Sequence, residues 1–443
     1  MIASDDVRRQ TLRLGIPGVL SMLTASLATL LEALILSREN TALSSAVGVS
    51  YSLVTLIQTI GFTLATGAGS FVSLCLGRNA EKEAQTTAST ALFLSLLLAI
   101  VFMAAGLLFT KPLLRLLGAP PDTAASGIVY ARYVLLTGPL LCPALVASGL
   151  LRAKGKMIPN MTAYLIGSAV GAALLLLLVP CLHLGVHGAG LAMLVREGTT
   201  LFLLLCTLKS GHLHDVSLSP RVFQNIMASG LPTLLRQGVI SLSSVLLCHA
   251  CAAFSPSVLA GMGLAVRACA LVSSAVIGFG QGLQPVCGFQ YGTGRLSLCR
   301  EAYVFCQKAA LLALIPVSLL FFLFSQKLLA PFAPDADALR IGTASLRAQS
   351  IVFLAQGAVT LMSVVTQSMG LTVRASLVSV SRQGIFSVLI LLCKNFGLPG
   401  LILCQSVSDL LALIFSYMMT KSLFKKGGLT GFSSARSSHS DVR

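Results

Sequence analysis

The sequence predicts an all-α polytopic membrane protein with twelve transmembrane helices in two six-helix bundles related by an internal parallel repeat. Charged residues make up 10% of the chain and hydrophobic residues 55%, whereas a soluble domain is about one quarter charged. Apolar stretches of about 18 residues or more, which cross a bilayer as helices, recur throughout the chain. Glycines also recur at a fixed offset between the two halves. A soluble globular protein is therefore excluded.

Twelve stretches are long and apolar enough to be membrane spans. We expect them at residues 12–36, 43–76, 87–110, 124–151, 158–182, 184–208, 222–253, 256–290, 301–325, 338–368, 373–396 and 398–424. They divide the chain into a cytoplasmic N-terminus (1–11), an N-terminal six-helix bundle (12–209), a cytoplasmic linker (210–221), a C-terminal six-helix bundle (222–424) and a cytoplasmic tail (425–443). The tail is rich in glycine and serine, which predicts disorder.

An offset of 215 residues places glycines and a proline of the two bundles in register. The aligned pairs are Gly15 and Gly230, Pro17 and Pro232, Gly48 and Gly263, Gly67 and Gly282, Gly77 and Gly292, and Gly155 and Gly370. Both halves begin on the same side of the predicted membrane, so the repeat is parallel. Such repeats are typical of secondary transporters, whose site lies between the halves and alternates its access by rocking. A duplicated scaffold without transport is the alternative.

Lysine and arginine are distributed unevenly between the two sides of the predicted membrane. The side opposite to the termini holds only Arg38, Lys111, Arg115, Lys327 and Lys394 in its loops. Because cytoplasmic loops are enriched in basic residues, both termini are predicted to be cytoplasmic, in a multi-pass protein of the inner (plasma) membrane. The net charge of +17 is carried mainly by these short loops, so no nucleic-acid partner is expected.

Three carboxylates fall within predicted spans, namely Glu32, Glu197 and Asp409. An unpaired charge at mid-membrane costs about 3 kcal/mol or more, so each needs a partner or a function. Glu32 is the main candidate for ion coupling, because a carboxyl group in a low dielectric can carry a proton or bind Na⁺. The alternative for Glu32 is an ion pair with Arg38 near the outer mouth.

Glu197 is the second candidate for ion coupling. It adjoins Arg196, and adjacent residues do not face each other on a helix. The alternative to coupling is therefore a structural ion pair with an arginine of another span. Asp409 is expected to pair with a basic residue or to lie near the cytoplasmic end of its span.

Buried arginines and amides are candidates for the lining of a substrate cleft. The candidate cleft residues are Gln281, Gln284, Arg267, Arg382, Gln383 and Gln237. An arginine within the membrane needs a partner or a wet cavity. Gln281 and Gln284 are three residues apart and share one helix face, so both are assigned to the cleft. For Gln237 and Gln383, lining the cleft and joining helices by hydrogen bonds are equally open.

Motifs of enzymes are missing from the sequence. It contains no P-loop, no nucleophile elbow and no His/Asp/Glu metal cluster, so we expect neither an enzyme nor a bound cofactor or metal. Without a nucleotide site, transport would be driven by a gradient of H⁺ or Na⁺. Cys248 and Cys251 form a CxxC motif in mid-span, and we interpret them as small packing residues.

Several stretches resemble the multidrug and toxic compound extrusion (MATE) family. GQGLQPVCGFQYGTGR at 280–295 is similar to the signature of the family's eighth span, and ATGAGSFVSLCLGRNAEKEA at 65–84 is similar to its counterpart in the first half. GLLRAKGKMIPNM at 149–161, LGVHGAGLA at 184–192 and SRQGIF at 381–386 resemble three further family stretches. The resemblance covers nearly the whole chain.

The resemblance implies export of cationic or amphipathic compounds by H⁺ or Na⁺ antiport through a V-shaped cleft between two six-helix bundles. Glu32 stands where many bacterial members have Asp, so the carboxylate is kept. In the fifth span the family often has Asn followed by Asp-Pro, whereas this chain has Leu175 and Val179 before Pro180. An ion site built on that Asp is therefore missing. Glu197 stands where Gln is common, and it could supply the lost carboxylate.

The predicted function is export of amphipathic organic compounds or drugs, driven by H⁺ or Na⁺ antiport with alternating access. Loss of the span-five acid, together with Arg267 and Arg382, predicts a neutral or positive cavity, because an unpaired buried arginine repels a desolvated cation. An anionic or zwitterionic substrate is then as compatible as a cation. The alternatives are a lipid-linked precursor flippase of the wider superfamily and a transport-dead membrane scaffold. The expected partners are the solute and membrane lipid, and the expected state is a monomer.

Overall fold

The computed structural model describes residues 6–39, 41–112, 125–208, 216, 219–333, 335–393 and 396–421. Within these ranges eleven helices are long and apolar enough to cross a membrane, and one further pair of helices forms a span bent by 56°. The prediction of twelve spans is confirmed when the bent pair is taken as one. That the tenth span is broken was not predicted.

The first half contains six long helices. They are α1 (Val7–Glu39), α2 (Thr41–Gly77), α3 (Glu81–Leu108), α5 (Ala125–Ala153), α6 (Met157–Leu176) and α7 (Gly185–Leu208). Pro180 lies in a π-helical turn that extends α6, η1 (Leu177–Cys181). The amide N–H of Leu182 donates to the carbonyl oxygen of Leu177 at 3.1 Å, so the wider turn re-satisfies backbone groups that a proline frees inside a membrane helix.

The second half repeats this order, with its fourth span divided. The helices are α8 (Pro220–Ala252), α9 (Pro256–Gly292), α10 (Leu296–Leu329), α11 (Ala336–Ile351), α12 (Phe353–Ser368), α13 (Thr372–Cys393) and α14 (Gly397–Thr420). The break between α11 and α12 falls at Val352. Leucines on the outer face of α10, such as Leu312 at 73% and Leu323 at 57% exposed, fit a lipid-facing surface.

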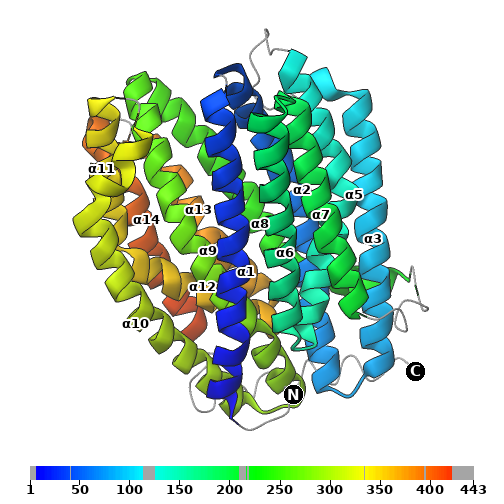
Figure 1. Cartoon of the computed structure of the whole chain (residues 1–443). Coiled ribbons are helices and arrows are strands. Elements are labelled where there is room, and N and C mark those ends of the chain that lie inside the picture. The colour runs from blue at the N-terminus through cyan, green and yellow to red at the C-terminus, as the bar shows by residue number, and fades with distance from the viewer. Residues whose placement is uncertain are drawn as a thin grey trace.

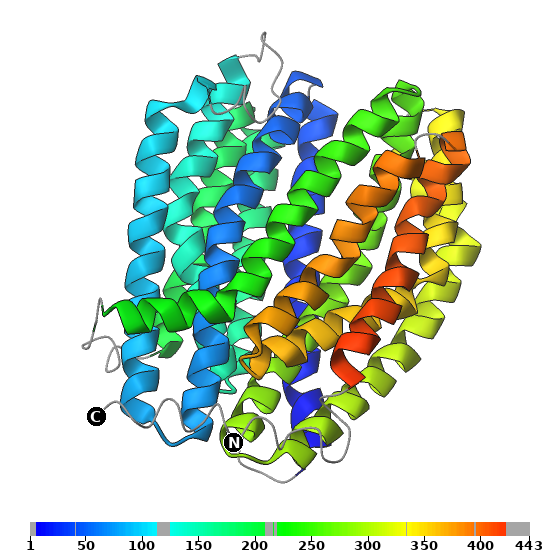
Figure 2. The ribbon, with the colours of Figure 1, turned by 180° about the vertical axis from the view of Figure 1, so that it is seen from behind.

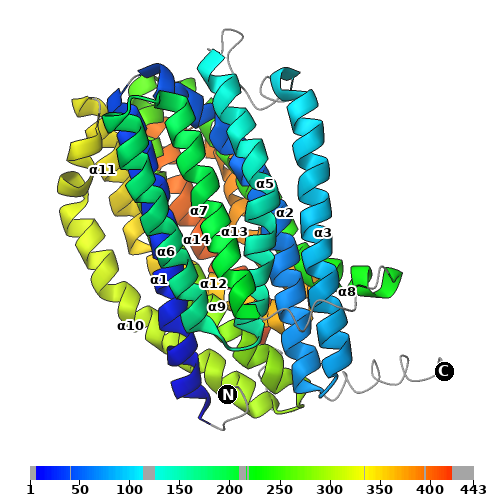
Figure 3. The same cartoon turned by 45° about the vertical axis from the view of Figure 1, so that its right-hand side comes forward.

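The two halves lie side by side as two bundles. In Figure 1 the helices α2, α3, α5, α6 and α7 occupy one side and α10, α11 and α14 the other, with α1 in front between them. Figure 3 shows the first half from its outer side, with α6, α7, α5 and α3 across the front. This arrangement matches the predicted pair of six-helix bundles.

Glycines of the repeat hold the two halves against each other. A Cβ atom added at Gly282 on α9 would lie 2.5 Å from the Cα atom of Gly15 on α1. The equivalent pair, Gly67 on α2 and Gly230 on α8, is also in close contact, because a Cβ atom at Gly67 would lie 3.1 Å from the Cα atom of Gly230. Such approaches are possible only without a side chain. The sequence repeat therefore corresponds to paired contacts across the interface between the halves.

These contacts lie at one end of the bundle. They join the first turns of α1 and α8 to the last turns of α2 and α9, and Gly77 meets Gly292 at the very ends of α2 and α9. This end is the side that the charge distribution predicts to be cytoplasmic. In Figure 2, α2 (blue) and α8 (green) lie together in the lower part and separate toward the top. The halves are thus packed together on the predicted cytoplasmic side.

Candidate functional site

The first half contains a buried network of charged side chains. Arg196 on α7 lies 3.4 Å from Glu32 on α1, between its Nη1 and the Oε2 atom, and 3.0 Å from Glu197, between its Nε and the Oε1 atom. Tyr130 on α5 donates its hydroxyl to the Oε1 atom of Glu32 at 2.6 Å. The side chains of Arg196, Glu32 and Glu197 are only 18%, 12% and 10% exposed. The structure therefore brings both predicted ion-coupling residues together.

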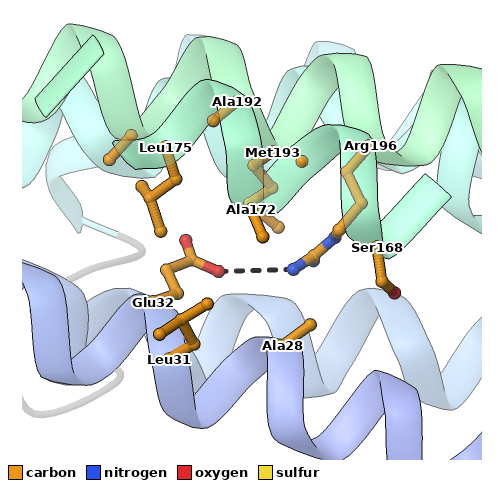
Figure 4. Close-up of a pocket in the computed structure, with 11 residues that line it drawn as sticks. Ala28, Leu31, Glu32, Ser168, Ala172, Leu175, Ala192, Met193 and Arg196 are labelled. Atoms are coloured by element: carbon orange, nitrogen blue, oxygen red, sulfur yellow. Dashed lines mark hydrogen bonds and ion pairs between the residues drawn. The ribbon is translucent and has the colours of Figure 1, made fainter. Parts of the chain in front are cut away.

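A glycine on α6 allows Arg196 to reach Glu32. A Cβ atom at Gly171 would lie 2.8 Å from the Cβ atom of Arg196, so the arginine side chain crosses α6 where α6 has no side chain. In Figure 4, Glu32 points from α1 toward α6 and α7, and Arg196 meets it from above. The approach of three helices thus depends on one small residue.

A cavity of about 20 Å³ remains beside the ion pair. Its lining includes Glu32, Arg196 and Ser168 and is otherwise mainly apolar, with Leu31, Ala172 and Met193 among the contributors. A polar cavity of ~10–15 Å³ is enough for one water. The site therefore has room for a proton carried on water or for one small ion, and it has no room for an organic solute.

Two carboxyl groups, Glu32 and Glu197, face the single guanidinium of Arg196, so the network holds one uncompensated negative charge when both are ionised. Ionised carboxylates and a guanidinium are costly to bury, and the unpaired charge is the costlier part. A proton or a monovalent cation would neutralise it. No group of three or more His, Cys, Asp or Glu side chains that could hold a metal ion occurs in the described part of the chain.

One prediction about this network was wrong. We expected Glu197 not to pair with Arg196, because adjacent residues point in different directions on a helix. The two side chains nevertheless form the ion pair at 3.0 Å, because a guanidinium on a long flexible stem can reach back along its own helix. The alternative pairing of Glu32 with Arg38 cannot be compared, since the side chain of Arg38 lies outside the described residues.

The second half holds a different ion pair. Arg382 on α13 donates from Nε to the Oδ1 atom of Asp409 on α14 at 2.6 Å and from Nη2 to the Oδ2 atom at 3.4 Å. Gln405 donates to the same Oδ1 atom at 2.9 Å. Asp409 is 2% exposed, and its expected pairing with a basic residue is confirmed.

Gln281 and Gln284 are buried in the interface between the halves. Gln281 accepts a hydrogen bond from Nη1 of Arg152 on α5 at 2.9 Å, and Gln284 donates to the hydroxyl of Ser70 on α2 at 2.5 Å. They are 6% and 7% exposed. In this conformation both amides therefore join α9 to the first half, and their predicted role in a substrate cleft stays a prediction.

Three other predicted cleft residues are accessible at the surface of the protein. Arg267 on α9 is exposed, and Gln237 on α8 and Gln383 on α13 are half-buried. Gln237 follows Gly230 by seven residues, so it lies on the face of α8 that packs on α2. Gln383 accepts a hydrogen bond through its backbone oxygen from Ser243 of α8 at 3.0 Å. None of the three side chains is fully buried, and their role in a substrate cleft stays a prediction.

Two residues of these networks were missed in the sequence. Tyr130 is 4% exposed and bonded to Glu32, but nothing in its sequence surroundings distinguishes it from an interfacial tyrosine. Arg152 follows the predicted span 124–151 directly and was therefore expected in a cytoplasmic loop, yet it is 4% exposed. The matching family stretch around Arg152 was the available signal that it has a special role.

The sequence model of the MatE family matches residues 17–177 and 232–392. The starts, 17 and 232, and the ends, 177 and 392, are each separated by 215 residues, which is the offset that the glycines give. The multidrug export protein MepA of Staphylococcus saprophyticus is 20% identical over 387 residues, which cover 85% of each chain.

Two solved structures share the fold. One is an outward-facing conformation of a multidrug resistance MATE family transporter of the MOP superfamily, with a TM-score of 0.88 and 22% identity over 95% of this chain and 97% of that one. The other is a MOP superfamily transporter from Pyrococcus furiosus, described by the reverse polarity of its binding pocket, with a TM-score of 0.87 and 21% identity over the same shares. At these identities the likeness shows the fold.

Proposed function

Because the chain belongs to the MatE family of membrane transporters, we propose that it exports amphipathic organic compounds or drugs across the inner membrane by antiport with H⁺ or Na⁺. The similar MepA proteins are named multidrug export proteins, which supports a drug-like substrate. The observation that supports ion coupling is the buried network of Glu32, Arg196 and Glu197, which holds two carboxyl groups and only one guanidinium.

The network suits a reversible cation site. Tyr130 and Arg196 hold the carboxylate of Glu32 in place at 2.6 and 3.4 Å, so the carboxylate is already oriented before a cation binds. When a proton or Na⁺ neutralises Glu32, Arg196 keeps its shorter ion pair with Glu197. Cation binding at Glu32 therefore changes the attraction between α1 and α7. It leaves no buried charge unpaired, and an unpaired buried charge would be costly.

Helix α1 links this network to the interface between the halves. Its first turns contact α9 through Gly15 and Gly18, and its later turns carry Glu32. A change in the attraction between Glu32 and Arg196 biases the position of α1, and with it the contact that closes the cytoplasmic side. Ion loading and the alternation between two conformations are coupled in this way, as antiport requires.

Vesicles test the proposal. Full-length protein is reconstituted, and efflux of a fluorescent amphiphile is followed under an imposed pH gradient, an imposed Na⁺ gradient, or neither. We expect one gradient to drive efflux and Glu32→Gln to reduce it by about tenfold or more, the scale of a coupling of a few kcal/mol. Glu32→Asp, which keeps the charge, is expected to retain part of the activity.

Two results would contradict the coupling. The first is efflux that no gradient accelerates. The second is gradient-driven efflux that is equal in wild type and Glu32→Gln. Exposed Glu301, which is 42% exposed beside Arg8, gives the matched control, because Glu301→Gln removes the same charge outside the network.

A further inference from the structure

The second half contains a charge network of the opposite sign to the first. In the first half, two carboxylates face one guanidinium. In the second half, the Arg382–Asp409 pair lies on helices that include α13, and α13 packs against α8, which carries a second arginine, Arg236. Arg236 is two helical turns from Ser243, whose hydroxyl donates to the backbone oxygen of Gln383, the residue next to Arg382. The three side chains therefore carry one uncompensated positive charge.

Arg236 lies between α8 and α13. It precedes Ser243 by seven residues and so shares its helix face, and Ser243 hydrogen-bonds to the hydroxyl of Ser387 on α13 at 2.7 Å. Arg236 is half-buried, and no carboxylate among the described residues forms an ion pair with it. An arginine within a membrane protein that lacks a carboxylate partner requires water or an anion.

Arg267 adds a further positive charge on the outer side of the Arg382–Asp409 pair. Arg382 is about 15 Å along the 22-residue helix α13 from Thr372, at 1.5 Å per residue, so it lies near the middle of a bilayer whose core is ~30 Å thick. Arg267 is about 16 Å from the outer end of α9 at Pro256, and because α9 has 37 residues this places Arg267 in the outer third of the helix. Arg267 shares its helix face with Ser274, which is hydrogen-bonded to Ser26 of α1 at 2.7 Å. It is exposed and faces the first half above the point where α1 and α9 meet.

We propose that Arg236, beside the Arg382–Asp409 pair, forms a subsite in the second half that binds the anionic group of an amphipathic solute, with Arg267 at its approach. A guanidinium pairs well with carboxylate, sulfonate and phosphate oxygens. A cation there would meet the repulsion of two or three arginines with one carboxylate to offset it. The inference rests on the proposed export function and adds its substrate class, an anion or a zwitterion.

Binding measurements on the full-length protein test the subsite. Radiolabelled taurocholate, an amphipathic sulfonate, is the anionic probe, and tetraphenylphosphonium is the cationic one. In wild type we expect saturable binding of taurocholate. In Arg236→Gln we expect its Kd to rise by about tenfold or more, the usual scale for removal of one partner of a buried charge pair, while Arg236→Lys retains part of the affinity.

Loss of folding does not explain such a result. Arg236 has no carboxylate partner in the described residues, so Arg236→Gln is expected to leave the thermal midpoint in detergent unchanged or higher. Arg340 on α11 is exposed in the same half, and Arg340→Gln is the control with the same loss of charge. Equal taurocholate affinity in wild type and Arg236→Gln, or equal losses in Arg236→Gln and Arg340→Gln, would overturn the proposal.

The outcomes also separate this inference from the proposed function. Efflux of tetraphenylphosphonium that depends on Glu32, without binding of taurocholate, leaves the export function standing and makes the substrate class wrong. If no gradient drives efflux of either probe, both proposals are wrong. Nanodiscs with and without phosphatidylglycerol distinguish the source of the anionic group. If phosphatidylglycerol competes with taurocholate, the subsite binds a lipid headgroup; if it does not compete, the subsite binds a free solute. Either result supports the Arg236 subsite.

Discussion

Arg196 lies between two carboxylates and contacts both, so it sets the charge balance of the first half. Glu32 has a second donor in Tyr130, whereas no other basic side chain pairs with Glu197 in the described residues. Removal of the guanidinium therefore leaves two negative charges close together in a low dielectric. Breaking such a network by removing one partner therefore costs more stability than the intact network contributes to folding.

Arg196→Gln is expected to lower stability by about 3–5 kcal/mol, because it leaves buried carboxylates without their cation. The double substitution Arg196→Gln with Glu197→Gln removes one of those charges and is expected to recover at least half of the loss. Urea or heat unfolding in detergent measures both. Arg132 on α5 is exposed, and Arg132→Gln is the control. A double variant no more stable than Arg196→Gln alone would contradict the network.

Sequence reasoning identified the charged residues better than their partners. Glu32, Glu197 and Asp409 are recognisable because carboxylates are rare in spans. Their partners depend on which helices meet, and this is a property of packing rather than of the local sequence. Tyr130 lies 98 residues from Glu32 in the chain, and the Arg196–Glu197 pair depends on a bend of a long side chain that a helical-wheel argument ignores.

At the scale of the helix, α9 carries one of the second-half arginines and also forms much of the interface with the first half. Its inner face meets α1 at Gly278 and Gly282, its outer third carries Arg267, and Gln281 and Gln284 bond to α5 and α2. One helix thus contacts three helices of the opposite half. The packing of small residues, rather than apolar burial, holds such contacts in a membrane.

Gly282→Ala is expected to destabilise the protein and to reduce transport, because the new methyl carbon would lie 2.5 Å from the Cα atom of Gly15 and neither backbone can yield cheaply. Gly263, on the same helix, has nothing within 4 Å of an added Cβ atom. Gly263→Ala is expected to raise stability by up to ~1 kcal/mol through helix propensity. Thermal unfolding and vesicle efflux measure both. Equal effects of the two substitutions would show that the close approach is unimportant.

Hydropathy predicted the boundaries of some spans closely, but it missed the start of α3 (Glu81–Leu108) by six residues and did not predict the irregular interior of two spans. The predicted spans 184–208 and 256–290 agree with α7 and α9 to within two residues at each end. The bend at Val352 and the π-helical turn at Pro180 were not predicted. Apolar composition reports only whether a segment suits lipid, and it does not report where neighbouring helices allow the backbone to break.

At the scale of the whole molecule, the halves are joined by polar bonds as well as by glycines. Arg152 reaches Gln281, and Thr66 on α2 donates to Thr233 on α8 at 2.9 Å. Within the second half, Gln367 on α12 donates to the same Thr233 at 3.0 Å. All of these lie toward the predicted cytoplasmic side, so the conformation seen here is one in which that side is shut.

Arg152→Gln is expected to loosen the closed side, because it removes a charged hydrogen bond worth about 1.5–3 kcal/mol between the halves. Hydrogen–deuterium exchange of peptides covering 67–77 and 278–292 measures the effect, and we expect faster exchange in both. Lys156, which is exposed in the following loop, provides the control Lys156→Gln. Unchanged exchange in Arg152→Gln would mean that the glycine contacts alone keep the halves together.

The paired glycine contacts have a consequence for how the two halves recognise each other. Gly15 meets Gly282 as Gly230 meets Gly67, and Gly77 meets its own counterpart, Gly292. This is the rule of an isologous interface, in which one patch contacts a copy of itself across a two-fold axis. Each six-helix half therefore carries a self-complementary surface, with Gly77 and Gly292 close to the axis. The two halves pack against each other as the subunits of a covalently linked homodimer would, although the first half has an excess of carboxylates and the second an excess of arginines in its charge network.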